Sequence, residues 1–236
     1  MLRIAVISDI HYADRCQSPK RKGEWALHLL TEAVRRLNED VRPDVVAVLG
    51  DLIDDPAAPD RLERLEQLRD IIERVDAPYI VLPGNHDPDP DVFYRVMPRP
   101  ADAVDIKGVR FISFVDAEEP GWNASRSATD LARMDAARAD GHTGPLVMLQ
   151  HVPVLPPGAT SCPYTYTNID DVISRCDAQA LTLSIGGHHH RGTQPVKRNK
   201  TTYLCVKALC EEPFVFTTVD LAETEARVAE HTVPGP

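Results

Sequence analysis

The sequence predicts an α/β fold in a single domain that spans residues 1–236. In the first half, apolar, β-branched runs alternate with amphipathic stretches, which is typical of strands that alternate with helices. A chain of 236 residues is also long enough to build one such domain around a substantial core. The sequence contains neither an internal repeat nor a low-complexity linker. Its periodicity leaves open whether the strands form one sheet or two.

The first half predicts three strands separated by two helices. Apolar runs predict strands over 2–8, 44–50 and 79–83. A first helix is expected over 24–38, because apolar residues recur there at helical spacing with charged residues between them. Asp60 is expected to cap the second helix, and Glu63 three residues later completes the pattern of a capping box.

The second half predicts more strands than helices. Strand-like runs cover 109–115, 146–150 and 180–185, and helices are expected near 128–140 and 168–175. The tail contains three further runs, at 203–209, 214–221 and 225–233. We expect these three runs to form consecutive antiparallel strands.

Composition and charge narrow the classes of partner. The chain has 36 acidic and 26 basic residues, a net charge of −10, and an acidic surface repels long polyphosphate backbones. We therefore expect no long nucleic acid as partner, and a phosphorylated substrate needs local cations or metals to attract it. No apolar run approaches the length of a membrane span, and the N-terminus lacks a signal-peptide pattern, so we expect no membrane association. The five cysteines are odd in number and include no C-x-x-C, which favours reduced thiols in a cytoplasmic protein.

Five polar motifs carry the candidate chemistry, and each follows an apolar strand-like run. They are SDIH (8–11), GDLID (50–54), GNHD (84–87), QHVP (150–153) and GHHH (187–190). In open α/β sheets the ligand crevice lies beyond the carboxyl ends of the strands, so we expect these loops to meet. Alone, each motif also fits a plain turn, a buried histidine or a surface histidine tract. Together they supply seven candidate metal ligands: Asp9, His11, Asp51, Asn85, His151, His188 and His190.

These ligands fit two metal ions. They comprise four imidazoles, two carboxylates and one amide, and all are used if one carboxylate bridges the two ions. Paired metals lie about 3.5–4 Å apart and hold the attacking and leaving oxygens of an in-line displacement. The mixed nitrogen and oxygen set favours Mn, Fe or Zn over Mg, as divalent or trivalent ions.

Other residues of the same motifs have predicted roles beside the metals. His86 is the candidate acid catalyst, and Asp87 is expected to hold its imidazole in the correct tautomer. His189 is expected to point away from the metals. Asp54 and Asp55 are expected to be solvated or to act as caps.

In this order, the five motifs resemble those of the calcineurin-like metallophosphoesterase family, over roughly residues 2–190. The resemblance implies a two-sheet β-sandwich flanked by helices, with the metals at one edge. It implies that one metal is held by Asp9, His11 and His190, the other by Asn85, His151 and His188, and that Asp51 bridges them. It also implies that a metal-held hydroxide attacks phosphorus, while His86 stabilises the transition state or protonates the leaving oxygen.

The motifs SDIHYADR (8–15), GDLID and GHHHRG (187–192) are similar to those of the branch that contains the manganese-dependent ADP-ribose/CDP-alcohol diphosphatases. One departure is position 11, which is commonly Gln in the animal members and is His here. The core motifs are also similar to those of bacterial cyclic-nucleotide phosphodiesterases. The implied substrate is a small nucleotide-like phosphodiester or pyrophosphate. The alternatives are a cyclic-nucleotide phosphodiesterase, a phosphomonoesterase, or an inactive binding scaffold, which would predict missing ligands.

Residues near the motifs are candidates for substrate contact. The arginines could hold a second phosphate and the aromatic residues could stack on a base, although each also fits a surface or core role. The candidates are Tyr12, Arg15, Trp122, Asn123, Tyr164, Tyr166 and Arg191. Glu211 and Glu212 either bind ribose hydroxyls or mark an exposed turn. The sequence leaves the oligomeric state open.

Overall fold

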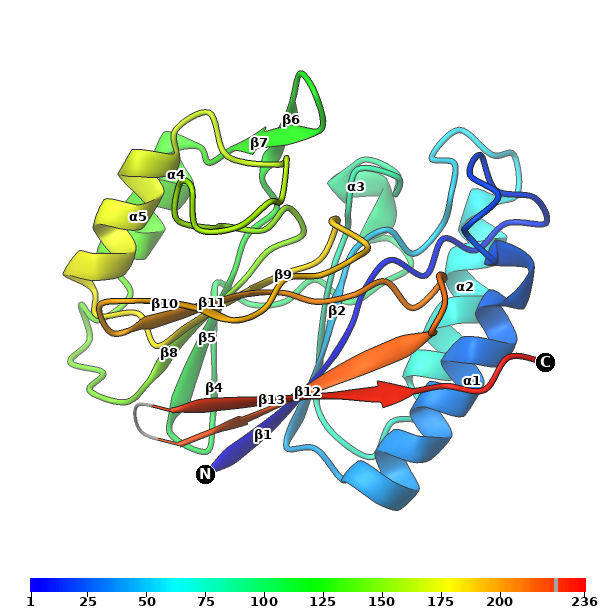
Figure 1. Cartoon of the computed structure of the whole chain (residues 1–236), viewed down its shortest axis with the longest axis horizontal. Helices are drawn as coiled ribbons and strands as arrows, with labels where there is room; N and C mark the ends of the chain where they lie inside the picture. The colour runs from blue at the N-terminus through cyan, green and yellow to red at the C-terminus, as the bar shows by residue number, and fades with distance from the viewer. Residues whose placement is uncertain (223–224) are drawn as a thin grey trace.

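Two β-sheets pack face to face at the centre of the molecule, and helices cover the outer face of each (Figure 1). The structure, a computed structural model, describes residues 1–222 and 225–236. This arrangement confirms the α/β class and the helix-flanked sandwich that the motif resemblance implied. Among the described helices, none is long and apolar enough to cross a membrane.

The first sheet has the strand order β13-β12-β1-β2-β3. Its strands are β1 (Leu2–Ile7), β2 (Val45–Leu49), β3 (Tyr79–Leu82), β12 (Val215–Leu221) and β13 (Ala226–Thr232). Strands β1, β2 and β3 are parallel, whereas β12 is antiparallel to both β1 and β13. The three parallel strands therefore end at the same edge of the sheet.

The second sheet has the order β10-β11-β9-β8-β5-β4. Its strands are β4 (Ala103–Ile106), β5 (Val109–Ser113), β8 (Leu146–Leu149), β9 (Leu183–Gly186), β10 (Val196–Arg198) and β11 (Thr201–Cys205). The four central strands, β5, β8, β9 and β11, are parallel to one another. The edge strands β4 and β10 are antiparallel to β5 and β11. A separate hairpin pairs β6 (Ala117–Glu119) with β7 (Asn123–Ser125) and projects from one end of the molecule (Figure 1).

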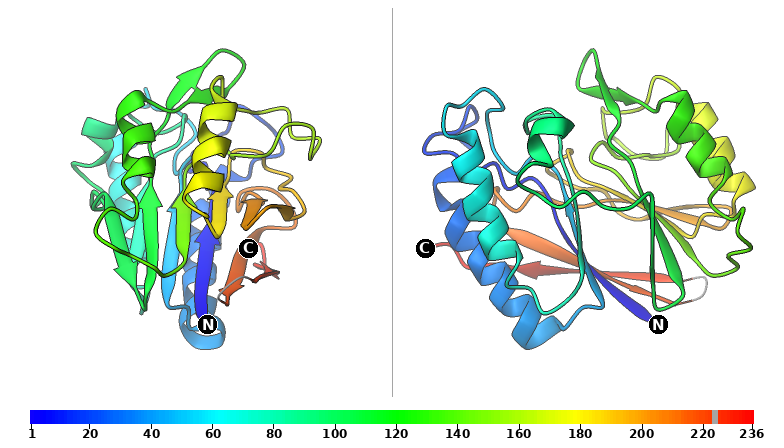
Figure 2. Two further views of the ribbon diagram at one scale, coloured as in Figure 1. Left: turned by 90° about the vertical axis from the view of Figure 1, so that its left-hand side faces the viewer. Right: turned by 180° about the vertical axis from the view of Figure 1, so that it is seen from behind.

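Helices α1 and α2 cover the first sheet, and α4 and α5 cover the second (Figure 2). The α-helices are α1 (Ala26–Arg36), α2 (Arg61–Ile72), α3 (Pro90–Phe93), α4 (Ala128–Asp135) and α5 (Ile169–Ala178). A 3-10 turn, Gly23–Trp25, leads into α1, and a π-helical turn, Leu37–Val41, follows it. The helix predicted over 24–38 therefore consists of three consecutive helical types.

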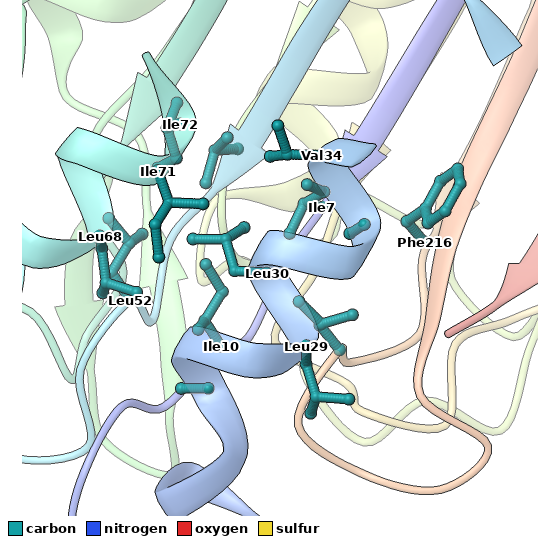
Figure 3. Packing of buried hydrophobic residues seen from close by; sticks show 14 of the residues in the cluster. Ile7, Ile10, Leu29, Leu30, Val34, Leu52, Leu68, Ile71, Ile72 and Phe216 are labelled. Atoms are coloured by element: carbon teal, nitrogen blue, oxygen red, sulfur yellow. The ribbon is translucent and has the colours of Figure 1, made fainter. Parts of the chain in front are cut away.

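Three apolar layers hold these elements together. Leu30 and Val34 of α1 and Leu68 of α2 pack with Ile7 of β1 in the layer shown in Figure 3. A second layer fills the space between the two sheets, and a third lies beneath α4 and α5. Because strands of both sheets are buried on both faces, they read as continuous apolar runs rather than as alternating ones.

Two predictions about local structure are wrong. The side chain of Asp60 makes no capping hydrogen bond at the start of α2 and instead accepts one from Nε of Arg64 at 2.8 Å, so no capping box forms. Of the three tail runs, the second and third form the antiparallel pair β12–β13 as predicted, but the first does not join them, because β11 pairs in parallel with β9 in the other sheet. The predicted helix near 128–140 also ends earlier, at Asp135.

Candidate dinuclear metal centre

The carboxyl ends of five parallel strands meet at one edge of the sandwich. Asp9 follows β1, Asp51 follows β2, Asn85 follows β3, His151 follows β8 and His188 follows β9. Three of these loops come from the first sheet and two from the second. The prediction that the five motif loops meet is therefore confirmed by the distances between their side chains.

The backbone at this edge adopts conformations that L-residues avoid. Asp9, His11, Asp51 and His188 all have positive φ angles, of 57°, 50°, 53° and 64°. A left-handed residue with a side chain costs about 1–2 kcal/mol, and such strain concentrates at functional sites. The strand-end loops also need glycine: a Cβ on Gly84 would lie 2.3 Å from Oδ1 of Asp51.

One set of ligand atoms gathers around His11. Its Nε2 lies 3.2 Å from Nε2 of His190 and 3.3 Å from Oδ2 of Asp51. Nε2 of His190 lies 3.4 Å from Oδ1 of Asp9. These four side chains form one of the groups in which all potential ligand atoms lie within 4.8 Å of one another.

A second set gathers around His151. Its Nε2 lies 3.3 Å from Oδ2 of Asp51, 3.1 Å from Oδ1 of Asn85 and 3.2 Å from Nδ1 of His188. The same oxygen of Asp51 therefore borders both sets. The structure brings all seven predicted ligands together and divides them as the family resemblance implied.

These spacings fit two metal ions. Ligand atoms bound at about 2.1 Å to one cation lie about 3.0 Å apart at a right angle and about 3.4 Å apart at a tetrahedral angle. The six separations given above, 3.1 to 3.4 Å, lie in that interval. The seven side chains would therefore suit two metal ions, and Asp51 contacts the histidines of both sets.

Hydrogen bonds on the far side of the rings select which nitrogen of each histidine faces the metals. Nδ1 of His151 donates to the Leu49 carbonyl at 2.7 Å, and Nε2 of His188 donates to the Trp122 carbonyl at 3.0 Å. A carbonyl oxygen only accepts, so the nitrogen that faces it carries the proton, and the other nitrogen keeps its lone pair for a metal.

The other two imidazoles contact carboxylates. Nδ1 of His190 donates to Oε1 of Glu211 at 2.8 Å. Nδ1 of His11 lies 3.0 Å from Oδ1 of Asp54, although it lacks the alignment of a hydrogen bond. The nitrogens left facing the sets are thus Nε2 of both rings, in agreement with the ligand spacings.

Burial and charge act in opposite directions at the two aspartates. Burial alone raises the pKa of Asp51, but the neighbouring His151 and His11 hold it well below its ordinary value. Burial also raises the pKa of Asp9, but the hydrogen bond and the charge of His190 outweigh it and lower this pKa to about 2. Both carboxylates are therefore ionised at neutral pH, as metal ligands must be.

His86 lies beside both sets and lines the same cleft, but Asp87 does not orient it. Nδ1 of His86 donates to the backbone carbonyl of Asp54 at 2.8 Å, and its Nε2 lies 3.5 Å from Nη1 of Arg21. The Asp87 carboxylate instead accepts hydrogen bonds from backbone N–H groups of Leu52, Ile53 and Gly84. The predicted role of Asp87 is therefore wrong, because its oxygens are used to tie the GNHD loop to the GDLID loop.

Comparison with known proteins agrees with this geometry. A model of the calcineurin-like phosphoesterase family matches residues 2–192. The chain belongs to the calcineurin-like phosphoesterase family. It is therefore a metal-dependent phosphoester hydrolase, and its family implies two divalent metal ions.

Solved structures with low sequence identity share the fold of this calcineurin-like phosphoesterase. A dimetal phosphatase from Danio rerio has a TM-score of 0.75 and 17% identity, over 99% of each chain. GAP50, the anchor in the inner membrane complex of Plasmodium, has a TM-score of 0.56 and 10% identity, over 100% of this chain and 89% of that one. No curated protein matches the sequence.

Only some of the predicted substrate residues of the phosphoesterase lie at its cleft, which has a volume of about 490 Å³. Trp122, Tyr164 and Arg191 line the cleft together with four of the predicted ligands, Asp51, Asn85, His188 and His190. His189, expected to point away, belongs to neither ligand set but also lines the cleft, with its ring centroid 5.9 Å from that of Tyr164.

The remaining candidates have structural contacts elsewhere. The hydroxyl of Tyr12 donates to Gln67 at 2.8 Å, and Arg15 is exposed outside the residues that line the cleft. Tyr166 is buried with its hydroxyl 2.7 Å from Oδ2 of Asp116. Asn123 supports the loop by accepting a hydrogen bond from the backbone of Thr165 and donating one to Pro120.

Four functional residues were missed or misinterpreted from the sequence. Asp54 is buried rather than solvated, and it accepts hydrogen bonds from Arg21 at 2.7 Å and from the backbone of Gln17 at 2.8 Å. Glu211 binds His190, a role not considered for it, whereas its neighbour Glu212 is exposed. Lys20 and Arg21 line the cleft. No motif indicates these two basic residues, because they lie in the loop after SDIH, at no fixed distance from the motif.

Proposed function

We propose that this phosphoesterase hydrolyses a small nucleotide-like phosphodiester or pyrophosphate at the dinuclear centre. The observation that carries the proposal is the charge of the cleft. Lys20, Arg21 and Arg191 line it beside the ligand sets, although the chain as a whole has a net charge of −10. Cations beyond the metal ligands favour a substrate that carries negative charge at more than one phosphoryl group.

When bound, the two cations supply Lewis acidity toward a phosphoryl oxygen and lower the pKa of water enough to make it a nucleophile at neutral pH. The mixed nitrogen and oxygen donors favour Mn, Fe or Zn for both positions. Asp9, His11 and His190 would hold one cation, and Asn85, His151 and His188 would hold the other. Asp51 would bridge them, because its Oδ2 borders both sets.

His86 is positioned to serve the leaving oxygen. Its Nδ1–H donates to the Asp54 carbonyl, which fixes the orientation of the ring. Nε2 is the nitrogen that would pass a proton to the leaving group, the role of a general acid. Nη1 of Arg21 donates to Oδ1 of Asp54 at 2.7 Å and lies 3.5 Å from this Nε2, so the guanidinium is held beside His86, where it can also contact the phosphoryl group.

Arg191 is the better placed of the two arginines considered for a second phosphate. It follows the ligand His190 and lines the cleft, whereas Arg15 is exposed outside it. An arginine can grip a phosphate through two parallel hydrogen bonds. We therefore assign the second-phosphate contact to Arg191, with Lys20 beside the same cleft.

The direct test is the release of AMP with manganese, from ADP-ribose and from cyclic AMP in parallel. AMP from ADP-ribose alone is the expected result, and it would support the similarity to the ADP-ribose/CDP-alcohol diphosphatase branch. AMP from cyclic AMP alone would instead identify a cyclic-nucleotide phosphodiesterase. That result would overturn the assignment to a pyrophosphate. Release of phosphate only from monoesters would identify a phosphomonoesterase and overturn the proposal.

A matched pair of arginine variants tests the second-phosphate contact. Arg191→Ala is expected to raise KM for ADP-ribose by about 10-fold or more, because a hydrogen bond to a charged group is worth about 1.5–3 kcal/mol. Arg15→Ala removes the same charge outside the cleft and should leave KM unchanged. Equal KM values for the two variants would contradict the role given to Arg191.

A further inference from the structure

We propose that the tip of the β6–β7 hairpin is a binding subsite for a planar heteroaromatic ring, with Trp122 as its stacking platform. The chemical class of the ligand is a purine or pyrimidine joined to phosphate. This inference rests on the proposed function, because the ring must belong to a substrate whose phosphate reaches the metal ligands.

The indole of Trp122 is exposed at the cleft. Its side chain and backbone are 59% exposed, and among the large apolar residues that the structure describes only Met1 is more exposed. A tryptophan normally buries a large apolar surface, so an exposed one gains stability when a ligand covers it. Because Trp122 lines the same cleft as His188, that ligand would also lie beside the metal centre.

The backbone holds Trp122 in a conformation that disfavours any side chain. Gly121 and Trp122 have φ angles of +81° and +57°, at the turn between β6 and β7. Glycine adopts such angles without strain, whereas residues with a Cβ do not. A bulky residue kept at a strained and exposed position is an observation that points to function rather than to stability.

The hairpin is fixed to the metal centre by its main chain. The carbonyl of Trp122 accepts the hydrogen bond from Nε2 of His188 at 3.0 Å. Behind it, the backbone of Ala124 donates to Thr165 at 3.0 Å and accepts from Thr167 at 2.8 Å. The position of the indole is therefore set relative to a predicted metal ligand, as a subsite for part of the same substrate requires.

Tyr164 provides a second aromatic surface of the subsite. It comes from the segment that pairs with β7, and its ring packs edge-on against His188 with centroids 4.3 Å apart. Both Tyr164 and Trp122 line the cleft. Stacking on aromatic side chains tolerates any base, because every base has a π-face. The subsite is therefore expected to bind purines and pyrimidines alike, while the metals select the phosphate.

The test compares two non-hydrolysable probes on the metal-loaded protein. α,β-Methylene-ADP carries a base, and methylenediphosphonate is the matching probe without base and ribose. The chain has two tryptophans, so Trp25→Phe leaves Trp122 as the only one. In this variant we expect α,β-methylene-ADP to change the tryptophan fluorescence on binding, and methylenediphosphonate to leave it nearly unchanged.

Affinities of Trp122 variants give an independent measure. Trp122→Gly suits the positive φ, so the carbonyl that binds His188 and the metal content are expected to persist. It should lower the affinity for α,β-methylene-ADP by about 10-fold or more, which is the loss expected when a base loses its stacking partner. The affinity for methylenediphosphonate should not change. Trp122→Phe should restore most of the loss. Trp25→Phe, which removes an indole that packs against Phe214 away from the cleft, is the control.

Three results would overturn the subsite: no fluorescence response of Trp122, no loss of nucleotide affinity in Trp122→Gly, or an equal loss for both probes. The last would mean that the residue acts only through His188. AMP release from ADP-ribose, measured on the same preparations, separates this failure from that of the proposed function. Continued release with unchanged probe affinities rejects only the subsite, and absence of release from any nucleotide rejects both.

Discussion

Asp51 is the residue on which both ligand sets depend. Its Oδ2 lies 3.3 Å from an imidazole nitrogen of each set, and its Oδ1 accepts a hydrogen bond from the backbone of His86 at 2.9 Å. Among the described carboxylates, Asp51 is the one that belongs to both candidate ligand groups. His86 differs, because it lines the cleft and belongs to neither of these sets.

We predict that Asp51→Asn and His86→Ala affect different properties. Asp51→Asn should lower both metal content and turnover, because a bridging position between two cations needs negative charge. His86→Ala should keep the metal content and lower turnover about 100-fold or more, the usual contribution of a positioned general acid. Elemental analysis and initial rates on the same samples measure both effects. Equal loss of metal in the two variants would reject the separate roles.

Glu211 contacts the predicted ligand His190 and is expected to support metal binding through it. Its carboxylate accepts the hydrogen bond from Nδ1 of His190. Removing such a partner of a metal-binding histidine typically lowers metal affinity by about 10- to 100-fold. We therefore expect Glu211→Gln to lower metal affinity by about that factor. Glu212→Gln is a matched control, because that neighbour is exposed and lacks this contact. Competition with a chelator measures the affinity. Similar affinities for both variants would show that Glu211 does not support His190.

At this scale the sequence predicts which candidate ligands meet but not which acids support them. The five motifs point to these seven residues because each motif follows a strand that ends at the same edge. Asp54 and Asp87 occupy similar places, at the ends of GDLID and GNHD, yet Asp54 contacts His11 and Asp87 accepts three backbone N–H groups. Which loop faces which is set by tertiary packing, and no local pattern records it.

At the scale of elements, the N-terminal strand is fixed to the tail strand by a charged contact. Arg3 of β1 donates from Nε and Nη2 to both oxygens of Asp220 in β12, at 2.6 and 2.9 Å. Hydrogen bonding to Arg3 lowers the pKa of Asp220. Since β1 leads directly into the SDIH loop, this contact stabilises the strand that carries Asp9.

We predict that the stabilising effect of this pair depends on pH. Because the folded chain has the lower pKa, the contribution is present above the unfolded pKa of about 3.9 and is lost as the pH falls through the folded value. Asp220→Asn should lower the free energy of unfolding by about 0.5–1 kcal/mol at pH 7, a small effect because Arg3 is 39% exposed.

Urea unfolding of wild type and Asp220→Asn at pH 7 and below pH 4 measures this difference, which should shrink at the acidic pH. Asp91→Asn is the control, because the side chain of Asp91 is 93% exposed and its partner Arg99 is also largely exposed. A difference that stays constant across this range would show that the Asp220 charge does not stabilise the fold.

The pairing of elements was the least predictable part of the fold. The runs at 203–209 and 214–221 look alike in composition, yet β11 joins one sheet and β12 the other. Short strands with few apolar residues, such as β6 and β7, were not predicted at all. These elements are held by pairing with distant segments, for example Ala124 with Tyr166, which local periodicity does not reveal.

For the whole molecule, the arrangement of layers places the centre between two halves that share one apolar layer between their sheets. The first sheet with α1 and α2 supplies Asp9, His11, Asp51 and Asn85, and the second with α4 and α5 supplies the remaining ligands (Figure 1). Each half has its own apolar layer beneath its helices. We therefore expect removal of the metals with a chelator to abolish turnover and to leave the far-ultraviolet circular dichroism spectrum unchanged.

The two-sheet architecture itself could not be derived from periodicity, because buried strands of one sheet or of two read as the same continuous apolar runs. It was implied only through the resemblance of the motifs. The order of SDIH, GDLID, GNHD, QHVP and GHHH therefore carried more information about the whole molecule than the pattern of its strands did.

The central claim is that Asp51 joins two metal positions on which hydrolysis depends. The most direct measurement is the number of metal ions per chain in the reconstituted protein, titrated with manganese while phosphoester turnover is recorded. We predict two ions per chain in the active wild type and turnover that rises with occupancy of both positions. Full turnover with a single ion per chain, or turnover that persists after chelation, would contradict this account.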